Sequence, residues 1–171
     1  MSKEYFVTMA DYNLWANKKL CGWLAEISDD QWNQPIVSSF NSIRETVLHM
    51  CGAESVWVER MNKVTSPSWA PSTFKGSKDE HISLLISSSE SLKEFTAKIP
   101  ESVLNSLLFF RRLNGEENMM PYYQILAHVF NHSTYHRGQL VTMLRQAGFT
   151  TVGSTDLSVY FKSVATESNA N

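Results

Sequence analysis

Cysteine is scarce in this sequence, and the cysteines that occur are not arranged for disulfide or redox chemistry. The 171 residues include two, Cys21 and Cys51, which form no C-x-x-C unit. Two cysteines alone do not indicate the disulfide scaffold of a small secreted protein. We expect both to be small buried hydrophobic residues, and we expect the protein to work in a reducing cytoplasm.

Long apolar segments are also missing. No uninterrupted apolar run approaches the roughly 20 residues that a membrane-spanning helix requires. The N-terminus, MSKEYFVTMADYN, lacks the apolar run of a signal peptide. We therefore expect no membrane partner and a cytoplasmic location.

Charge of one sign is not concentrated anywhere in the chain. Lys and Arg number 15 against 17 Asp and Glu, a net charge of −2, and no basic cluster is longer than the pair Arg111–Arg112. Because nucleic-acid binders carry a basic face or stripe, we expect no nucleic-acid partner. The sequence also has no H-E-x-x-H and no nucleophile elbow, which are signatures of common hydrolases.

The residues that are present have the composition of an ordinary globular protein, with 43% hydrophobic and 19% charged residues. Apolar residues recur at helical spacing in four long stretches. An S-x-x-E pattern, which favours a helix start, opens the second and third stretches at Ser42 and Ser77. The predicted long helices cover residues 3–27, 43–62, 78–98 and 121–148.

The segments between and after these helices predict shorter elements. Residues 28–32 favour a capped turn, and residues 65–76 favour a loop. The run Leu107–Leu113, followed by Asn114-Gly115, predicts a small β-hairpin with a two-residue turn. A short terminal helix through Phe161 is expected next, and then a disordered tail over residues 165–171. The prediction is one all-α domain, residues 1–164, folded as a four-helix bundle with a small β-hairpin before the last long helix.

Two histidines lie in the middle of the apolar stripe of the fourth predicted helix. His132 and His136 are four residues apart, so their rings project from one face on successive turns. This spacing lets one helix offer two imidazoles to one metal ion. The alternative is that both are hydrogen-bonded core residues, since an unpaired buried polar group costs roughly 1–3 kcal/mol.

Three other ionisable residues on the helices receive weaker interpretations. His49 falls near the border of the apolar face of the second helix, so periodicity favours partial exposure. Glu54 lies within that face, and we expect its carboxylate to reach water, the alternative being a partner of the site residues. His81 lies in the first turn of the third helix, where we expect exposure to solvent.

The motifs then carry a resemblance to a known family. The segment HVFNHSTYHRGQL, from His128 to Leu140, resembles the H-x-x-x-H-R-G-Q signature of the DinB/YfiT-like family of metalloenzymes. DYNLWANKKL (11–20), VLHMCGAESVWVER (47–60) and TDLSVYF (155–161) resemble its first-helix, second-helix and C-terminal motifs. The resemblance implies a bundle with up-down-down-up connectivity that is often a homodimer.

The resemblance also implies a divalent metal held by three histidines. Transferred position by position, these are His49, His132 and His136. His128 is then assigned to packing or to the surroundings of the ligands. Gln139 is a candidate partner of a ligand, although a polar residue at the edge of the stripe is the favoured interpretation.

Two neighbours of these histidines complete the set of expectations. Gly138 costs roughly 1 kcal/mol relative to Ala inside a helix, so we expect another helix to pack closely against it. Arg137 is expected to point away, toward solvent or a partner subunit.

Three neutral imidazoles would leave a coordination position open, which favours a catalytic or substrate-binding site. Imidazole suits zinc, nickel, copper or iron, with zinc or nickel preferred here. Relatives of this fold include thiol-dependent S-transferases, so the resemblance implies an enzyme that activates a low-molecular-weight thiol toward a small-molecule substrate in stress response or detoxification. The alternatives are a metal-dependent hydrolase and a non-enzymatic bundle with a structural metal.

Overall fold

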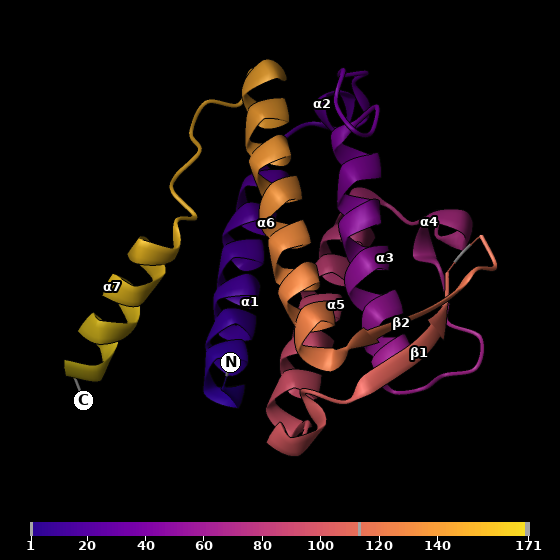
Figure 1. Cartoon of the computed structure of the whole chain (residues 1–171). Coiled ribbons are helices and arrows are strands. Elements are labelled where there is room, and N and C mark those ends of the chain that lie inside the picture. Colours follow the sequence, from indigo (N-terminus) through magenta and orange to yellow (C-terminus); the bar gives the residue numbers. More distant parts are fainter. Residues whose placement is uncertain (1, 113, 170–171) are drawn as a thin grey trace.

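The computed structural model describes residues 2–112 and 114–169 and is built around four long helices. They are α1 (Lys3–Glu26), α3 (Ile43–Met61), α5 (Lys78–Lys98) and α6 (Tyr122–Gln146). In Figure 1, α1 and α6 run in one direction and α3 and α5 in the other. The predicted all-α bundle with up-down-down-up connectivity is therefore confirmed.

Serine side chains define the starts of three of these helices. Ser2, Ser42 and Ser77 each accept a hydrogen bond from the backbone N–H three residues later, which satisfies a donor that the helix itself leaves unpaired. At α5 the bond is reciprocal, because the Glu80 side chain accepts from the Ser77 N–H. Pro121 stands just before α6, and Gly148, with φ of +87°, follows its end.

Shorter elements join the long helices. They are α2 (Asp29–Asn33), α4 (Ala70–Thr73), the 3₁₀ turn η1 (Glu101–Val103), β1 (Leu107–Arg111), β2 (Glu117–Pro121) and α7 (Leu157–Asn169). Strands β1 and β2 form the predicted antiparallel hairpin. Beyond the last strand pair, Arg111–Glu117, the Arg112 N–H donates to the Glu116 carbonyl and the Gly115 N–H donates to the Arg112 carbonyl. The expected two-residue turn over Asn114-Gly115 is therefore wrong. Helix α4 lies within the segment that was expected to be a loop.

The chain ends in a longer helix than the sequence predicted. Helix α7 continues past Phe161 to Asn169 and lies beside the bundle (Figure 1). It is attached through aromatic contacts of Tyr160 with Tyr12 and Trp15, at ring-centroid distances of 5.8 and 5.5 Å. Residues 165–169, expected to begin a disordered tail, belong to this helix, and residues 170 and 171 lie outside the described residues.

The four long helices form a closed ring in which α1 packs on α5, α5 on α3, α3 on α6 and α6 on α1. Two separate apolar clusters fill the interior. One surrounds Leu24, Met50 and Leu140, and the other surrounds Phe6, Leu92 and Ile125. On each of the four helices, buried polar residues stand between the residues that belong to one apolar cluster and those that belong to the other. Together these side chains form a polar layer between the two clusters.

None of the helices in the described part of the chain is both long and apolar enough to cross a membrane.

Candidate metal centre

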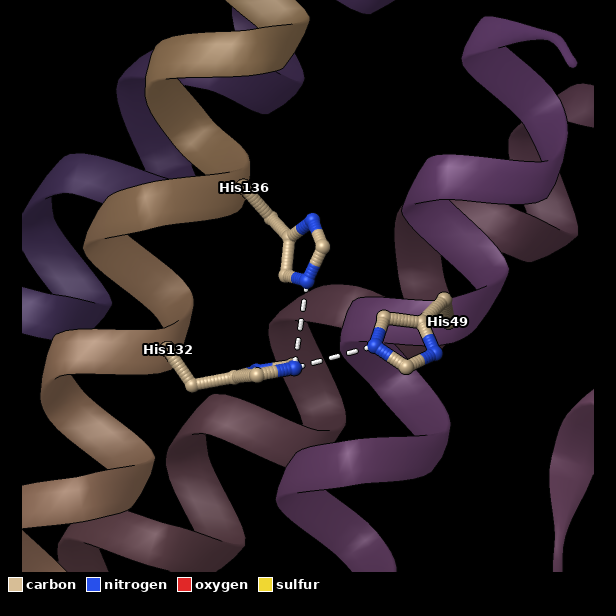
Figure 2. Close-up of side chains that lie close together, drawn as sticks. All are labelled: His49, His132 and His136. Atoms are coloured by element: carbon tan, nitrogen blue, oxygen red, sulfur yellow. Dashed lines mark hydrogen bonds between the residues drawn. The ribbon is translucent and has the colours of Figure 1, made fainter. Parts of the chain in front are cut away.

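Three histidines from two helices converge on one point between α3 and α6. Figure 2 shows the ring of His49, from α3, facing the rings of His132 and His136, from α6. His132 Nε2 lies 2.9 Å from His49 Nε2 and 3.1 Å from His136 Nε2. The nitrogens that the three residues offer all lie within 4.8 Å of one another. The residues that the sequence and the resemblance singled out are thus brought together, and His49 faces the cluster although periodicity left it at the border of the core.

The donor set and its spacing fit a divalent metal ion. Imidazole nitrogens 2.0–2.1 Å from a tetrahedral zinc lie roughly 3.3 Å apart, close to the two shortest N···N distances. Three neutral imidazoles contribute no negative charge and three of the usual four ligands. Without a metal, only one nitrogen of each close pair can carry a proton and donate it to the other. Hydrogen bonds among the three rings therefore leave part of the cluster's hydrogen-bonding capacity unused.

The surroundings keep the imidazoles in the neutral form that binds metal. Burial lowers the pKa of His49 to about 4, with a smaller contribution from His136. Burial, together with the charges of the neighbouring histidines, lowers the pKa of His132 to about 3. The pKa of His136 is lowered by burial and raised in part by its hydrogen bond to Gln139. At neutral pH all three rings therefore have a free lone pair.

Gln139 fixes the orientation of His136. Its side-chain Oε1 lies 2.8 Å from His136 Nδ1 and accepts that ring's proton, which leaves Nε2 as the atom facing the cluster. Its Nε2 donates to Ser39 Oγ at 2.6 Å. The favoured interpretation, a polar residue at the edge of the stripe, is therefore wrong, and Gln139 is a direct partner of a cluster histidine.

Aromatic side chains surround the histidines, and sequence analysis missed them. The Phe40 ring is 4.3 Å from that of His49, the Trp69 ring is 5.8 Å from His49, and the Tyr135 ring is 4.9 Å from His136. Phe40 and Trp69 lie in loops, where helical periodicity says nothing about direction. The one available signal was the presence of large aromatic residues in short polar loops next to the histidine-bearing helix.

Gly52 allows one of these aromatic loops to approach α3. A Cβ at this position would lie 2.5 Å from Pro71 Cδ and 3.2 Å from the Trp69 ring. Such distances are too short for a side chain, so glycine is what lets the segment around α4 close over the face of α3 that bears His49.

His128 lies beside the cluster rather than in it. Its ring is 5.7 Å from those of His132 and Trp57, and it is exposed. The set of nitrogens that meet at one point does not include it. This agrees with its assignment to packing.

Comparison with known proteins identifies the family of this chain. The model of the DinB family matches residues 1–167. The chain belongs to the DinB family. Protein DinB of Bacillus subtilis strain 168 is 29% identical over 171 residues, which cover 96% of this chain and 98% of that protein.

Solved structures of DinB-like proteins have the same fold. A DinB-like protein from Bacillus cereus ATCC 10987 superposes with a TM-score of 0.69 at 19% identity, covering 90% of this chain and 99% of the other. YfiT from Bacillus subtilis superposes with a TM-score of 0.68 at 13% identity, covering 88% and 91%. YfiT is described as a probable metal-dependent hydrolase with an unusual four-helix bundle topology.

Behind the histidines of this DinB-family protein lies the buried polar layer, and Glu54 is at its centre. Glu54 is 0% exposed, so the expectation that its carboxylate reaches water is wrong. Its two oxygens accept hydrogen bonds from the following side chains, at 2.7–3.2 Å: Asn13, Asn17, Ser88, Ser89 and Ser133. A buried carboxylate is tolerated because donors from the other three long helices surround it.

Arg137 belongs to the same layer, which overturns the expectation that it points to solvent or a partner. The residue is 2% exposed, and its Nη1 donates to the side-chain oxygens of Asn13 and Asn17 at 2.6 and 3.1 Å. Its guanidinium also lies over the Tyr12 ring, 5.2 Å from the centroid. Periodicity failed here because a helix inside a ring of four is buried over a wide arc.

Other single-residue expectations have mixed outcomes. Cys21 and Cys51 are buried free thiols, as predicted. His81 is buried, contrary to prediction, because it packs against Trp32 and Phe74 and its Nδ1 donates to the Ser77 carbonyl at 2.7 Å.

No helix packs against Gly138. Apart from its chain neighbours and its own helix backbone, nothing in the described structure lies within 4 Å of the position its Cβ would take. Gly138 instead lines a cavity of about 340 Å³, together with Val37, Tyr135 and Gln139. The cavity therefore adjoins two residues that contact His136.

Proposed function

We propose that this protein is a metal-dependent enzyme in which His49, His132 and His136 hold one divalent ion and a low-molecular-weight thiol reacts with a small electrophile. The observation that carries the proposal is the convergence of three imidazoles, and of no carboxylate, on one point among the described residues. Zinc or nickel fits this donor set. We expect the protein to act in the cytoplasm as a homodimer.

The proposed site has an open side for substrate. Three protein ligands leave at least one position for a small molecule. A divalent ion bound there would lower the pKa of a coordinated thiol or water. The rings of Phe40, Trp69 and Tyr135 form an apolar surface beside the histidines, and a cavity of about 340 Å³, lined in part by Tyr135 and Gln139, provides room for a small substrate.

Thiol transfer is favoured over hydrolysis because the carboxylate of Glu54 is not available to act as a base. Hydrolysis commonly needs a side chain that takes a proton from the attacking water. Glu54, on the same helix as His49, is fully buried, and its two oxygens already accept hydrogen bonds in the polar layer. A thiolate, once formed, attacks an electrophile without a further base, so thiol transfer suits this residue set better.

A metal-dependent hydrolase is the second candidate, favoured by the description of YfiT. In that case the exposed ring of His128, 5.7 Å from that of His132, is the available group for proton transfer. Replacing His128 with alanine would then abolish hydrolysis while leaving metal content unchanged.

Metal content tests the proposed ligands directly. We expect about one ion per chain in the wild type, and a loss of bound ion after dialysis in His49→Ala, His132→Ala and His136→Ala. His128→Ala is the matched control, because it removes an imidazole from the same helix outside the cluster, and it should retain the ion. Equal metal content in all five proteins would refute the site.

Activity is tested by thiol consumption. The metal-loaded wild type should consume a thiol such as cysteine or glutathione with at least one electrophile in a broad panel, and His132→Ala should not. A bound ion with neither thiol consumption nor hydrolysis, together with a lower thermal midpoint after chelation, would show a structural metal instead.

A further inference from the structure

A second cavity lies away from the histidines, at the C-terminal end of α3. It has a volume of about 450 Å³ and is lined by residues from the end of α3, from residues 63–67 and from strand β1. Figure 1 shows where α3 and β1 lie in the bundle. Three cationic side chains line it, Arg60, Lys63 and Arg111, and no acidic residue does. Arg60 is eleven residues after His49, roughly 16 Å along the helix at 1.5 Å per residue, so the cavity is separate from the candidate metal centre.

The walls of this cavity are apolar. They include Val64, Leu107 and Phe109, whose exposed fractions are 46%, 50% and 74%. Large hydrophobic side chains gathered at the surface in this way are characteristic of binding sites. Cationic residues set among apolar walls are complementary to a molecule with an acidic group on an apolar body.

Arg60 is the unusual member of the group. It is 9% exposed, and its guanidinium is packed against the rings of Trp57 and Phe110, at 4.8 and 5.4 Å from their centroids. Its Nη2 donates to the Arg111 carbonyl at 3.1 Å. Its Nε, shielded from solvent, and its Nη1 have no hydrogen-bond partner among residues 2–112 and 114–169.

The other arginines near this cavity and in the core have partners that Arg60 lacks. Arg111 forms an ion pair with Glu117, and Arg112 with Glu116. The buried Arg137 also has an Nε without a hydrogen-bond partner among the described residues. Its Nη1 and Nη2, however, donate to Asn13, Asn17 and Thr134, and it lies near the charge of Glu54. Within the described residues Arg60 forms no ion pair, although buried charges are normally paired. Burial, and then the charge of Arg112, lower the pKa of Arg60, and a bound anion would oppose both effects.

We propose that this cavity binds a small organic anion, with the acidic group on Arg60 and an aromatic or alkyl body against the walls formed by Val64, Leu107 and Phe109. Arginine presents a planar set of donors that matches the oxygens of a carboxylate or a phosphate. Lys63 adds positive charge at the edge of the cavity, where Arg111 also lies, paired with Glu117. The site needs no metal.

The first test compares an anionic probe with a neutral probe of similar size and the same apolar body. Binding of 4-phenylbutyrate is measured by isothermal titration calorimetry and by shifts of amide signals from β1 in ¹H–¹⁵N spectra. We expect the neutral 4-phenylbutanol to bind at least about tenfold more weakly, the loss typical of a charge-assisted hydrogen bond. Phenyl phosphate is compared in parallel, and the tighter anion identifies the preferred acidic group. Equal binding of acid and alcohol would overturn the proposal.

The second test assigns the binding to Arg60. Arg60→Gln should weaken 4-phenylbutyrate binding about tenfold or more, whereas Arg145→Ala, which removes an exposed arginine from α6, should leave it unchanged. His132→Ala is included because a carboxylate can also bind a metal ion. Loss of binding in His132→Ala but not in Arg60→Gln would place the acid at the histidines and refute this site.

A variant of exposed residues covers the case in which Arg60→Gln does not fold. Lys63→Gln combined with Arg111→Gln removes two charges from exposed positions at the edge of the cavity. We expect weaker 4-phenylbutyrate binding by this double variant, with far-ultraviolet circular dichroism like that of the wild type. Unchanged affinity in the folded double variant would contradict the proposal.

Discussion

Two polar clusters occupy adjacent faces of the same two turns of α6, about 100° apart at 3.6 residues per turn, and they are built in opposite ways. His132 and His136 face α3 and the aromatic side chains, whereas Ser133 and Arg137, one residue further in each case, face the bundle interior. The inner cluster is sealed, and donors surround both oxygens of Glu54. In the outer cluster His49 and His132 are partly exposed and His136 is buried, and the cluster ends in imidazole nitrogens that face one another.

This difference in hydrogen bonding distinguishes a polar cluster that stabilises the fold from one that binds a ligand. In the inner layer nearly every donor and acceptor is matched by another helix, so nothing remains to bind a ligand. In the outer cluster the lone pairs exceed the protons available to them, so a cation completes it. Polar residues in a helix bundle therefore indicate a ligand site when their mutual hydrogen bonding is incomplete, and not simply because they are buried.

The largest expected effect comes from the inner cluster. Glu54→Ala removes the acceptor for five side chains and leaves the charge of Arg137 uncompensated, so we expect the free energy of unfolding to fall by about 3–5 kcal/mol. Urea denaturation measures this change. Glu90→Ala, which breaks the exposed ion pair with Lys18, is the control and should cost less than about 1 kcal/mol. Similar losses in the two variants would contradict a stabilising role for the layer.

A substitution beside the outer cluster should affect binding rather than folding. Gln139→Ala removes the acceptor that orients His136, and we expect about 10–100-fold weaker metal affinity with little change in the urea midpoint of the metal-free protein. Competition with a chromophoric chelator measures the affinity. Gln146→Ala, at the exposed end of the same helix, should bind metal as the wild type does. An unchanged affinity in Gln139→Ala would show that the hydrogen bond does not orient the ring.

Acidification should destabilise the metal-free protein through the outer cluster. The pKa values of His49 and His132, about 4 and about 3, lie below the ordinary value of 6.5. The unfolded chain therefore binds protons at a pH where the folded chain does not, and the free energy of unfolding decreases as pH falls below 6.5. Urea midpoints measured from pH 7.5 to 4.5 with a chelator present should fall more steeply for the wild type than for His132→Ala. Parallel curves would contradict this interpretation.

The smallest effect concerns the glycine next to the clusters. Because nothing packs against Gly138, Gly138→Ala should raise the free energy of unfolding by about 1 kcal/mol, the usual difference between these residues in a helix. Gly22→Ala is the matched control, since Gly22 is also exposed within a helix with nothing near its missing Cβ. A loss of stability in Gly138→Ala but not in Gly22→Ala would contradict the open space next to Gly138.

Sequence patterns predicted the elements well because the four long helices are marked by local sequence signals. Serine caps and helical spacing placed α5 at its observed bounds, and the run around Leu107 predicted the hairpin. The pair His132 and His136 followed from spacing of four within one helix. Their meeting with His49 required the resemblance, since no local pattern relates residues on different helices.

What the sequence did not predict depends on the packing of four helices at once. Periodicity assumes one buried face per helix, and it placed Arg137 outside. It placed Glu54 within the apolar face of its helix, but the expectation that the Glu54 carboxylate reaches water was wrong. Both are buried because neighbours cover more than one face and supply the necessary partners. Likewise, Phe40 and Trp69 reach the histidines through loops whose direction no periodicity specifies.

The polar layer also has a consequence for how the helices align. All four long helices contribute to it at one level, between two apolar clusters. Sliding any one helix by a turn would bring the Glu54 carboxylate or the Arg137 guanidinium against hydrocarbon, whereas the apolar clusters alone would tolerate such a shift. The layer thus fixes the axial register of the four helices. It thereby also determines which residues of α3 and α6 lie opposite each other.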